Sequence, residues 1–284
     1  MKSPMKQHTL ASSCVFTGVG LHTGKPVEMR LLPAPDDYGI VFHRTDLGEE
    51  AFVHASVANV SKARRSTELA QQGVQVRTAE HLLAALRCLH VDNALVQLNA
   101  MEVPILDGSA LPYVQALREC GLLEQKTDRR YLSVKRHAEF RDAKSGSSII
   151  VDPCDDLVVD LTIDFKSPMV GVQKAVYDPS VDFASQIAPC RTFCFHREIL
   201  LLRLLGLIKG GSLDNALVID DRKKVFLGGK KLYFDNELAR HKLLDLLGDF
   251  ALAGFPIRGR ITAYKPGHKT NTQALNHFIC ESIL

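Results

Sequence analysis

The sequence predicts an α+β protein built from two similar halves. Short strands cut by Gly, Pro and Asp turns fill residues 7–60, amphipathic helices follow, and a pattern of helix, strand, loop and helix occurs twice. In the first copy His81 precedes Asp107 by 26 residues, and in the second His241 precedes His268 by 27 residues. Halves related by duplication would set their helices side by side, with the polar faces meeting at a shared cleft.

Composition excludes several classes of protein. The chain has 284 residues, of which 46% are hydrophobic and 24% charged, so we expect a folded globular core. A formal charge of +3 is too mild to indicate nucleic-acid binding. Seven scattered cysteines without a C-x-x-C pair argue against disulfides and against a cysteine zinc site. No stretch resembles a signal peptide or a spanning helix, so we expect a cytoplasmic protein.

The first half begins with strands at 14–16, 27–32, 39–43 and 51–53. The loop at 17–26, TGVGLHTGKP, is either a tight hairpin or a cradle for phosphate, but it lacks the Walker spacing and a following helix. A helix starting near 77, RTAEHLLAALRCLHV, would be capped by Thr78 and carry Glu80 and His81 in its first turn. A strand at 94–98, the loop EVPILDGSA and a helix at 112–120 complete this half.

The polar segment EQKTDR at 124–129 suggests a domain boundary, which gives domains at 1–126 and 127–284. Strands are expected at 132–135, 148–151, 157–163, 216–219 and 259–264, with a last helix from 272 to about 283. Between them, residues 199–208 are apolar on nearly all sides apart from Arg203. This run is too short to span a bilayer, so it is a core helix, a channel for an acyl chain or a patch that faces a membrane.

The helix expected at 236–252, NELARHKLLDLLGDFAL, has one apolar face and one face with chemically active side chains. His241 and Asp245 lie one turn apart, so both could bind one metal ion, although a solvated face is the simpler reading. If the two halves meet, Glu80 and His81 would approach them, and His81, His241 and Asp245 would form a three-ligand site with one open position.

Seven motifs then become recognisable in order along the chain. They are GVGLHTGK (18–25), TAEHLLAAL (78–86), EVPILDGSA (102–110), RTFCF (191–195), GGSLDNALV (210–218), RHKLLDLLGD (240–249) and TAYKPGH (262–268). Together they resemble the family of UDP-3-O-acyl-N-acetylglucosamine deacetylases, the zinc amidases of the lipid A pathway. The resemblance implies two α+β domains of similar fold packed helix against helix, each with a small inserted subdomain, the second near 187–212.

The resemblance also implies roles for individual residues. Zinc would be bound by His81, His241 and Asp245, with iron as an alternative metal in the cell. Glu80 would be the general base and His268 the general acid. The resemblance further implies that Asp249 orients His268, Thr192 donates its hydroxyl to the oxyanion, and Lys242 lies beside the substrate.

The implied substrate is a UDP-linked acylated amino sugar, which loses its N-acetyl group by hydrolysis. The apolar run, including Leu201, would line a passage for the acyl chain, with Phe193 and Phe195 at its entry. Gly267 would adjoin the substrate, and Lys144, Asp164 and Phe165 are candidates for diphosphate and uracil contacts. We expect a monomer at the inner face of the inner membrane, with a peripheral membrane contact and no nucleic-acid partner.

One segment departs from the family pattern, because KARRSTEL at 62–69 carries two arginines and a glutamate where relatives have a short apolar and cysteine or threonine segment near the site. Two other functions stay open. A zinc amidase could act on another N-acetyl sugar, and a non-catalytic binding protein could share this fold. The second would predict a basic stripe with exposed aromatic residues, whereas the charge here is nearly balanced.

Overall fold

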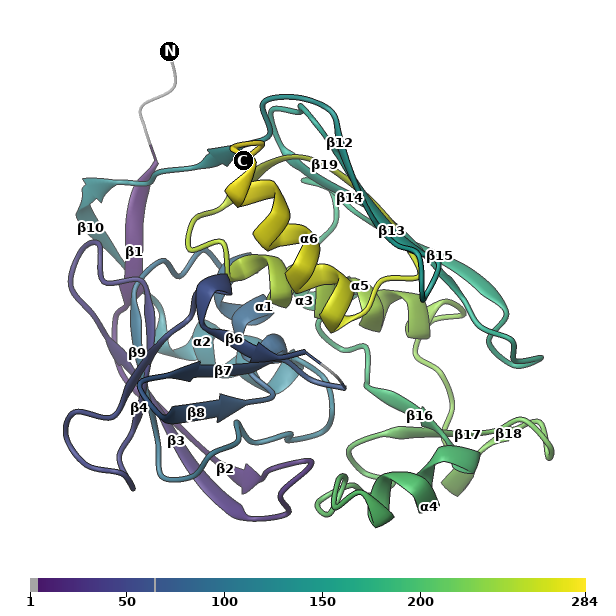
Figure 1. The fold of residues 1–284 in the computed structure, drawn as a ribbon. Coiled ribbons are helices and arrows are strands. Elements are labelled where there is room, and N and C mark those ends of the chain that lie inside the picture. The colour runs from purple at the N-terminus through teal and green to yellow at the C-terminus, as the bar shows by residue number, and fades with distance from the viewer. Residues whose placement is uncertain (1–4, 64) are drawn as a thin grey trace.

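The computed structural model describes residues 5–63 and 65–284. Figure 1 shows two main sheets with the helices α1, α5 and α6 between them. A two-stranded ribbon of β1 (Lys6–Leu10) and β10 (Leu122–Asp128) lies beside the first sheet. This arrangement confirms the predicted α+β class with helices packed in the centre.

The first main sheet has the strand order β2-β3-β9-β4-β5. Its central strand β9 is antiparallel to β3 and parallel to β4. Alternate side chains of these strands, such as Val96 and Leu98, are buried against the helices. The strands are β2 (Cys14–Val19), β3 (Pro26–Pro33), β4 (Ile40–Arg44), β5 (Phe52–His54) and β9 (Ala94–Leu98).

The second main sheet repeats this plan with the order β12-β13-β19-β14-β15. Its central strand β19 is antiparallel to β13 and parallel to β14, and β11 adds a short parallel pair. The same pairing orientations in the same order confirm the duplication that the spacing predicted. The strands are β11 (Leu132–Ser133), β12 (Ala138–Asp142), β13 (Ser147–Asp152), β14 (Leu157–Asp164), β15 (Val172–Tyr177) and β19 (Ile257–Tyr264).

Each half carries an insert, which lies between β5 and the first long helix in the first half and between β15 and the first long helix in the second. The first insert contains η1 (Val57–Asn59), β6 (Val60–Lys62), β7 (Glu68–Gln71) and β8 (Val74–Arg77). The second, which we call the α4 insert, follows α3 (Phe183–Gln186). It contains β16 (Phe193–Phe195), α4 (His196–Leu204), β17 (Leu217–Asp220), β18 (Val225–Phe226) and η2 (Leu227–Gly229).

Two pairs of equivalent helices follow the inserts. They are α1 (Glu80–Cys88) with α2 (Leu111–Cys120), and α5 (Glu237–Ala251) with α6 (His268–Cys280). The apolar face of α5 is buried as its periodicity predicts, and α5 packs against α1, α6 and the second sheet. The polar face is buried as well, so the solvated alternative for this helix is wrong.

The backbones of α1 and α5 touch at Gly248. A Cβ atom placed on Gly248 would lie 2.0 Å from the carbonyl oxygen of Glu80, which is far inside van der Waals contact. A glycine in the middle of a helix lowers its stability, but here it allows the first turn of α1 to rest on α5. This contact fixes how the two halves are placed relative to each other.

Several expectations about individual elements need correction. Thr78 does not cap α1, because Ala79 is the N-cap and the Thr78 hydroxyl donates to Glu102 instead. The polar segment around 124–129 belongs to strand β10, so the expected boundary at residue 126 falls inside a strand. Strand β12 was not expected at all. The last helix starts at His268 rather than at 272, so His268 begins a helix and does not lie in the preceding loop.

The apolar run in α4 is not a core helix. Leu202 is its one buried residue, whereas four other leucines of the run are largely exposed. No helix in the described part of the chain is long and apolar enough to cross a membrane.

We expect Gly248→Ala to lower the free energy of unfolding by about 1–3 kcal/mol, because the added methyl group must push the backbones of α1 and α5 apart. Urea denaturation measures this change. Gly267→Ala is the control, since nothing lies within 4 Å of a Cβ atom at that extended position. Equal midpoints for the two variants would show that the helices do not need this close approach.

Candidate metal and catalytic site

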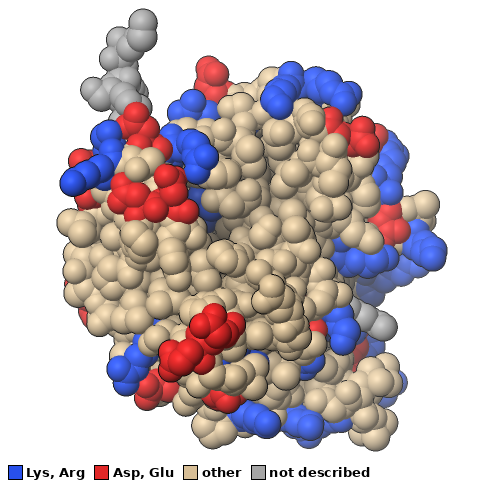
Figure 2. All heavy atoms as spheres, turned by 60° about the vertical axis from the view of Figure 1, so that its left-hand side comes forward, with Lys and Arg blue, Asp and Glu red and all other residues tan. Residues whose placement is uncertain are grey.

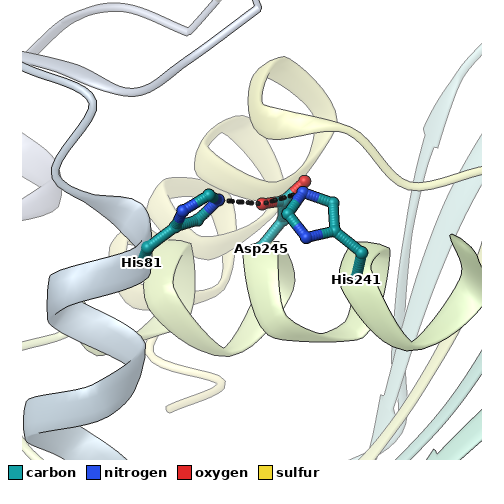
Figure 3. Close-up of side chains that lie close together, drawn as sticks. All are labelled: His81, His241 and Asp245. Atoms are coloured by element: carbon teal, nitrogen blue, oxygen red, sulfur yellow. Dashed lines mark ion pairs between the residues drawn. The ribbon is translucent and has the colours of Figure 1, made fainter. Parts of the chain in front are cut away.

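Three predicted ligands converge on one buried point. His81 lies in the first turn of α1, and His241 and Asp245 lie one turn apart on α5. The Nε2 atoms of both histidines are 3.5 Å from Asp245 Oδ1, and one ligand atom from each residue lies within 4.8 Å of the others. Figure 3 shows the two imidazoles facing the carboxylate from different helices. The duplication therefore brings together residues that are far apart in the sequence.

The chemical state of these groups suits a cation. The Nδ1 atom of His241 lies 3.1 Å from the carbonyl oxygen of Cys190, and as a donor there it leaves Nε2 free as a ligand. Burial lowers the pKa of His241 to about 3, so its imidazole is neutral. Burial would raise the pKa of Asp245, but nearby positive charges, above all the ammonium group of Lys242, hold the pKa well below its usual range. Two imidazoles and a carboxylate therefore fit a divalent metal ion.

Glu80 and His268 lie beside this point. The Nε2 atom of His268 is 3.7 Å from Glu80 Oε1 and 3.7 Å from Asp245 Oδ2. Its Nδ1 atom is 2.9 Å from Asp249 Oδ2, as expected for a residue that orients the ring. Burial alone would lower the pKa of His268. The carboxylates around it outweigh burial and raise the pKa to about 10, and the carboxylate of Asp249 has the largest effect among them. Burial raises the pKa of Glu80.

Thr67 is a residue of this site that the sequence did not reveal. Its hydroxyl donates to Asp249 Oδ1 at 2.5 Å, and its backbone N–H donates to Glu80 Oε2 at 3.2 Å. Thr67 therefore holds carboxylates on α1 and α5 at once. The family resemblance placed the segment KARRSTEL near the site, but no local periodicity marks Thr67 as the residue of this segment that enters the site from the first insert.

The site opens into a cavity of about 410 Å³. Lys242, Thr192 and Phe193 line it, together with the ligands and Glu80. The Nζ atom of Lys242 binds Asp245 Oδ2 at 2.7 Å and lies 5.6 Å from the centre of the Phe193 ring. The backbone of Thr192 is fixed by Gly108, whose carbonyl accepts its N–H at 2.8 Å.

An apolar groove of about 190 Å³ adjoins this cavity, because both are lined by Leu21, Arg65, Thr192 and Phe193. Ile199 and Leu202, on the inner side of α4, form part of its wall. Leu201 does not line the groove, since it lies on the exposed side of the helix. The buried ring of Phe195 packs against Phe165 at a centroid distance of 5.8 Å.

Only some of the other residues predicted to contact the substrate line the catalytic cavity. Phe165 and Gly267 line the catalytic cavity. Asp164 accepts hydrogen bonds from the Tyr264 hydroxyl at 2.6 Å and from Lys265 at 3.2 Å, so its carboxylate already has partners. Lys144 is exposed in the hairpin between β12 and β13 and does not line the cavity, although Asp142 and Ser145 of the same hairpin do.

The glycine-rich loop between β2 and β3 is held by a carboxylate of its own protein. Glu102 accepts hydrogen bonds from the backbone N–H groups of His22 and Thr23 at 2.9 and 2.8 Å. These two donors are therefore not available to a phosphate, and the hairpin interpretation fits the loop better. His22 is buried beside the groove, and among the described residues its ring nitrogens have no hydrogen-bond partner.

A buried His-His-Asp set with a carboxylate and a charged histidine beside it defines the class of metal-dependent hydrolases. Comparison with known proteins names the family within that class. The chain belongs to the UDP-3-O-acyl N-acetylglycosamine deacetylase family, whose model matches residues 7–279. The family predicted from the seven motifs is confirmed.

Individual relatives agree with this assignment. A UDP-3-O-acyl-N-acetylglucosamine deacetylase of Anaeromyxobacter sp. is 45% identical over 95% of this chain and 86% of that protein. The protein of the same name from Saccharophagus degradans is 42% identical over 97% of this chain and 90% of its own length. The bifunctional enzyme LpxC/FabZ of Porphyromonas gingivalis is 44% identical over 94% of this chain, which spans 63% of that longer relative.

We expect His241→Ala to lose about one equivalent of bound divalent metal per chain, because two ligands cannot hold the ion as three do. Atomic absorption after dialysis measures the metal. His137→Ala is the matched control, since that histidine is exposed, is paired with Asp152 and does not line the catalytic cavity. Full metal content in His241→Ala would place the metal elsewhere.

Proposed function

We propose that the protein hydrolyses the N-acetyl group of UDP-3-O-acyl-N-acetylglucosamine and releases acetate and the free amine, a step of lipid A biosynthesis. Family membership supports this substrate class. The observation that carries the chemistry is the placement of Glu80 and His268, 3.7 Å apart, beside the His81, His241 and Asp245 ligand set. We propose zinc as the metal, with iron as an alternative in the cell, because the donor set suits both.

A metal ion held by His81, His241 and Asp245 would supply Lewis acidity for the amide carbonyl and for a water molecule at neutral pH. Glu80 accepts a proton from the attacking water, whose oxygen forms the new bond to the carbonyl carbon. The hydroxyl of Thr192 donates to the oxyanion, and Lys242 adds positive charge nearby. His268 then donates its Nε2 proton to the amine as the carbon–nitrogen bond breaks.

The position of His268 suits this role as an acid. An amide anion is too basic to leave, so the nitrogen must gain a proton while the bond breaks. The carboxylates around His268 keep it protonated at neutral pH, and Asp249 fixes the ring so that Nε2 faces Glu80 and Asp245. Thr67 supports Asp249 in turn.

The groove beside the cavity favours a substrate with an acyl chain over a simple N-acetyl sugar. Its walls are mostly apolar, and each methylene buried there contributes roughly 0.8 kcal/mol. Phe193 lies where the groove and the catalytic cavity meet. For the nucleotide, Phe165 and Gly267 are better placed than Lys144, which would have to move toward the cavity. We further propose a cytoplasmic monomer that works at the inner face of the inner membrane.

The test of this function is Glu80→Gln, which keeps the size of the side chain but removes its basicity. We expect acetate release from the UDP-linked acyl sugar to fall by about 10²- to 10⁴-fold while the metal content stays unchanged. Glu119→Gln on α2 is the control, because that side chain is exposed away from the site. Undiminished turnover in Glu80→Gln would mean that another group is the base.

We expect a bell-shaped dependence of kcat/KM on pH. Activity needs Glu80 deprotonated, and since burial raises its pKa the acid limb lies above the ordinary value of 4.5. Activity also needs His268 protonated, and since the carboxylates around it raise its pKa to about 10, the alkaline limb lies near that pH. Asp249→Asn removes the carboxylate that raises the pKa of His268 most, so the alkaline limb should move to lower pH. A profile that stays flat from about pH 4 to 11 would contradict paired acid–base catalysis.

A further inference from the structure

The outer side of α4 exposes leucines that nothing in the described chain covers. Leu200 and Leu204 are 71% and 76% exposed, and Leu201 and Leu205 are 58% and 63% exposed. At 100° per residue the four fall within an arc of about 140° on one side of the helix. Large apolar side chains gathered in this way on a surface mark a site of contact with another phase or molecule.

These leucines are not needed for the acyl groove. The inner side of α4 supplies Ile199 and Leu202 to the groove, and Leu202 is 5% exposed. Leu200 and Leu204 lie on the opposite side and are absent from the groove wall. The helix is therefore apolar on two sides, of which only the inner one has a partner within the described residues.

The same region carries the net positive charge of the chain. Residues 196–231 contain eight Lys and Arg against four Asp and Glu, a net charge of +4, whereas the whole chain carries +3. The rest of the chain is therefore close to neutral, at −1. Among the described residues no carboxylate lies within 4.0 Å of the charged groups of Arg203, Arg222, Lys223 and Lys224, all of which are exposed.

Leucines and cations lie side by side here. Leu200 and Arg203 of α4 line a surface cavity of about 620 Å³ together with Arg222 and Lys223, from the turn between β17 and β18. Asp220 and Asp221 line it too, and Asp221 is paired with Arg197. Figure 1 places α4 at the lower edge of the molecule, and Figure 2 shows Lys and Arg side chains along that lower edge. We call these leucines and these four cations together the α4 surface.

We propose that the α4 surface docks the protein on a lipid bilayer that contains anionic headgroups. Leu200 and Leu204 would enter the boundary between headgroups and acyl chains, and the surrounding cations would bind lipid phosphates. A short helix with an apolar side and a basic rim has the features of a helix that lies in a membrane interface. Docking would set the outer side of α4 in the membrane while its inner side forms the wall of the acyl groove.

A second copy of the chain fits the α4 surface less well than an anionic bilayer does. In a two-fold dimer the α4 surface would face itself, so a net charge of +4 would meet another +4. An anionic membrane instead offers complementary charge together with an apolar phase. The charge of the surface therefore favours the bilayer.

Sedimentation with vesicles of phosphatidylcholine, with or without phosphatidylglycerol, tests this docking with the full chain and no substrate. We expect binding to the mixed vesicles that weakens with salt, and at least about tenfold weaker partitioning of the double variant Leu200→Ser with Leu204→Ser. The triple variant Arg222→Gln, Lys223→Gln and Lys224→Gln should also bind less. The control is Leu122→Ser with Leu123→Ser, which removes two exposed leucines from β10.

Three results would overturn the proposal: no binding of the unaltered protein, equal binding to neutral vesicles, or unchanged binding of the Leu200 and Leu204 double variant. A concentration-dependent dimer that this double variant abolishes would assign the surface to a second copy instead. Because no substrate is present, these outcomes do not depend on the hydrolysis proposed above, and acetate release from a dissolved substrate tests that separately.

Discussion

The contact between α1 and α5 at Gly248 is the constraint on which the site depends. The carbonyl group of Glu80 occupies the space where any other residue at 248 would carry a Cβ atom. With the helices this close, the first turn of α1 places Glu80 and His81 directly over the turn of α5 that holds Asp245. A wider spacing would leave His81 out of reach of the ligands on α5, however well each half folded alone.

The same proximity creates an electrostatic problem that a metal ion would relieve. Glu80, Asp245 and Asp249 are all at most 3% exposed, and their carboxylates lie around one small volume. Protonated His268 and Lys242 balance two of the three negative charges. Buried carboxylates without compensation are costly, so a divalent cation beside them stabilises the folded protein as well as the reaction. The raised pKa of Glu80 shows the cost of burying this charge.

Both inserts contribute residues that complete the site. The first insert brings Thr67 to Asp249 and Glu80, and the second brings Thr192 and the apolar groove. Glycines allow the backbones of these parts to pack closely against each other. A Cβ atom on Gly108 would lie 2.0 Å from the carbonyl oxygen of Asn215, so the loop before α2 rests directly on the second insert. The halves are thus joined by backbone contacts where side chains would not fit.

The sequence by itself determined the kind of chemistry and the pattern of elements. Periodicity located α5 with its apolar and polar faces, and the repeated spacing indicated the duplication that the strand order then displayed. The helix spacing made His241 and Asp245 candidates for a metal site, the inferred duplication added His81, and the resemblance of the seven motifs to the family supplied the ligand roles. These features are local, and local spacing follows from backbone geometry.

Only the tertiary structure decided which faces meet and what lies between them. His81 and Asp245 belong to different halves, and no periodicity reports that Gly248 lets their helices touch. The role of Thr67 could not be predicted, because it depends on an insert that folds back onto α1. The environment of α4 was likewise undetermined, since an apolar run reads the same whether it lies in a core or on a surface. Burial and contact arise from packing between distant segments, which a single sequence encodes only indirectly.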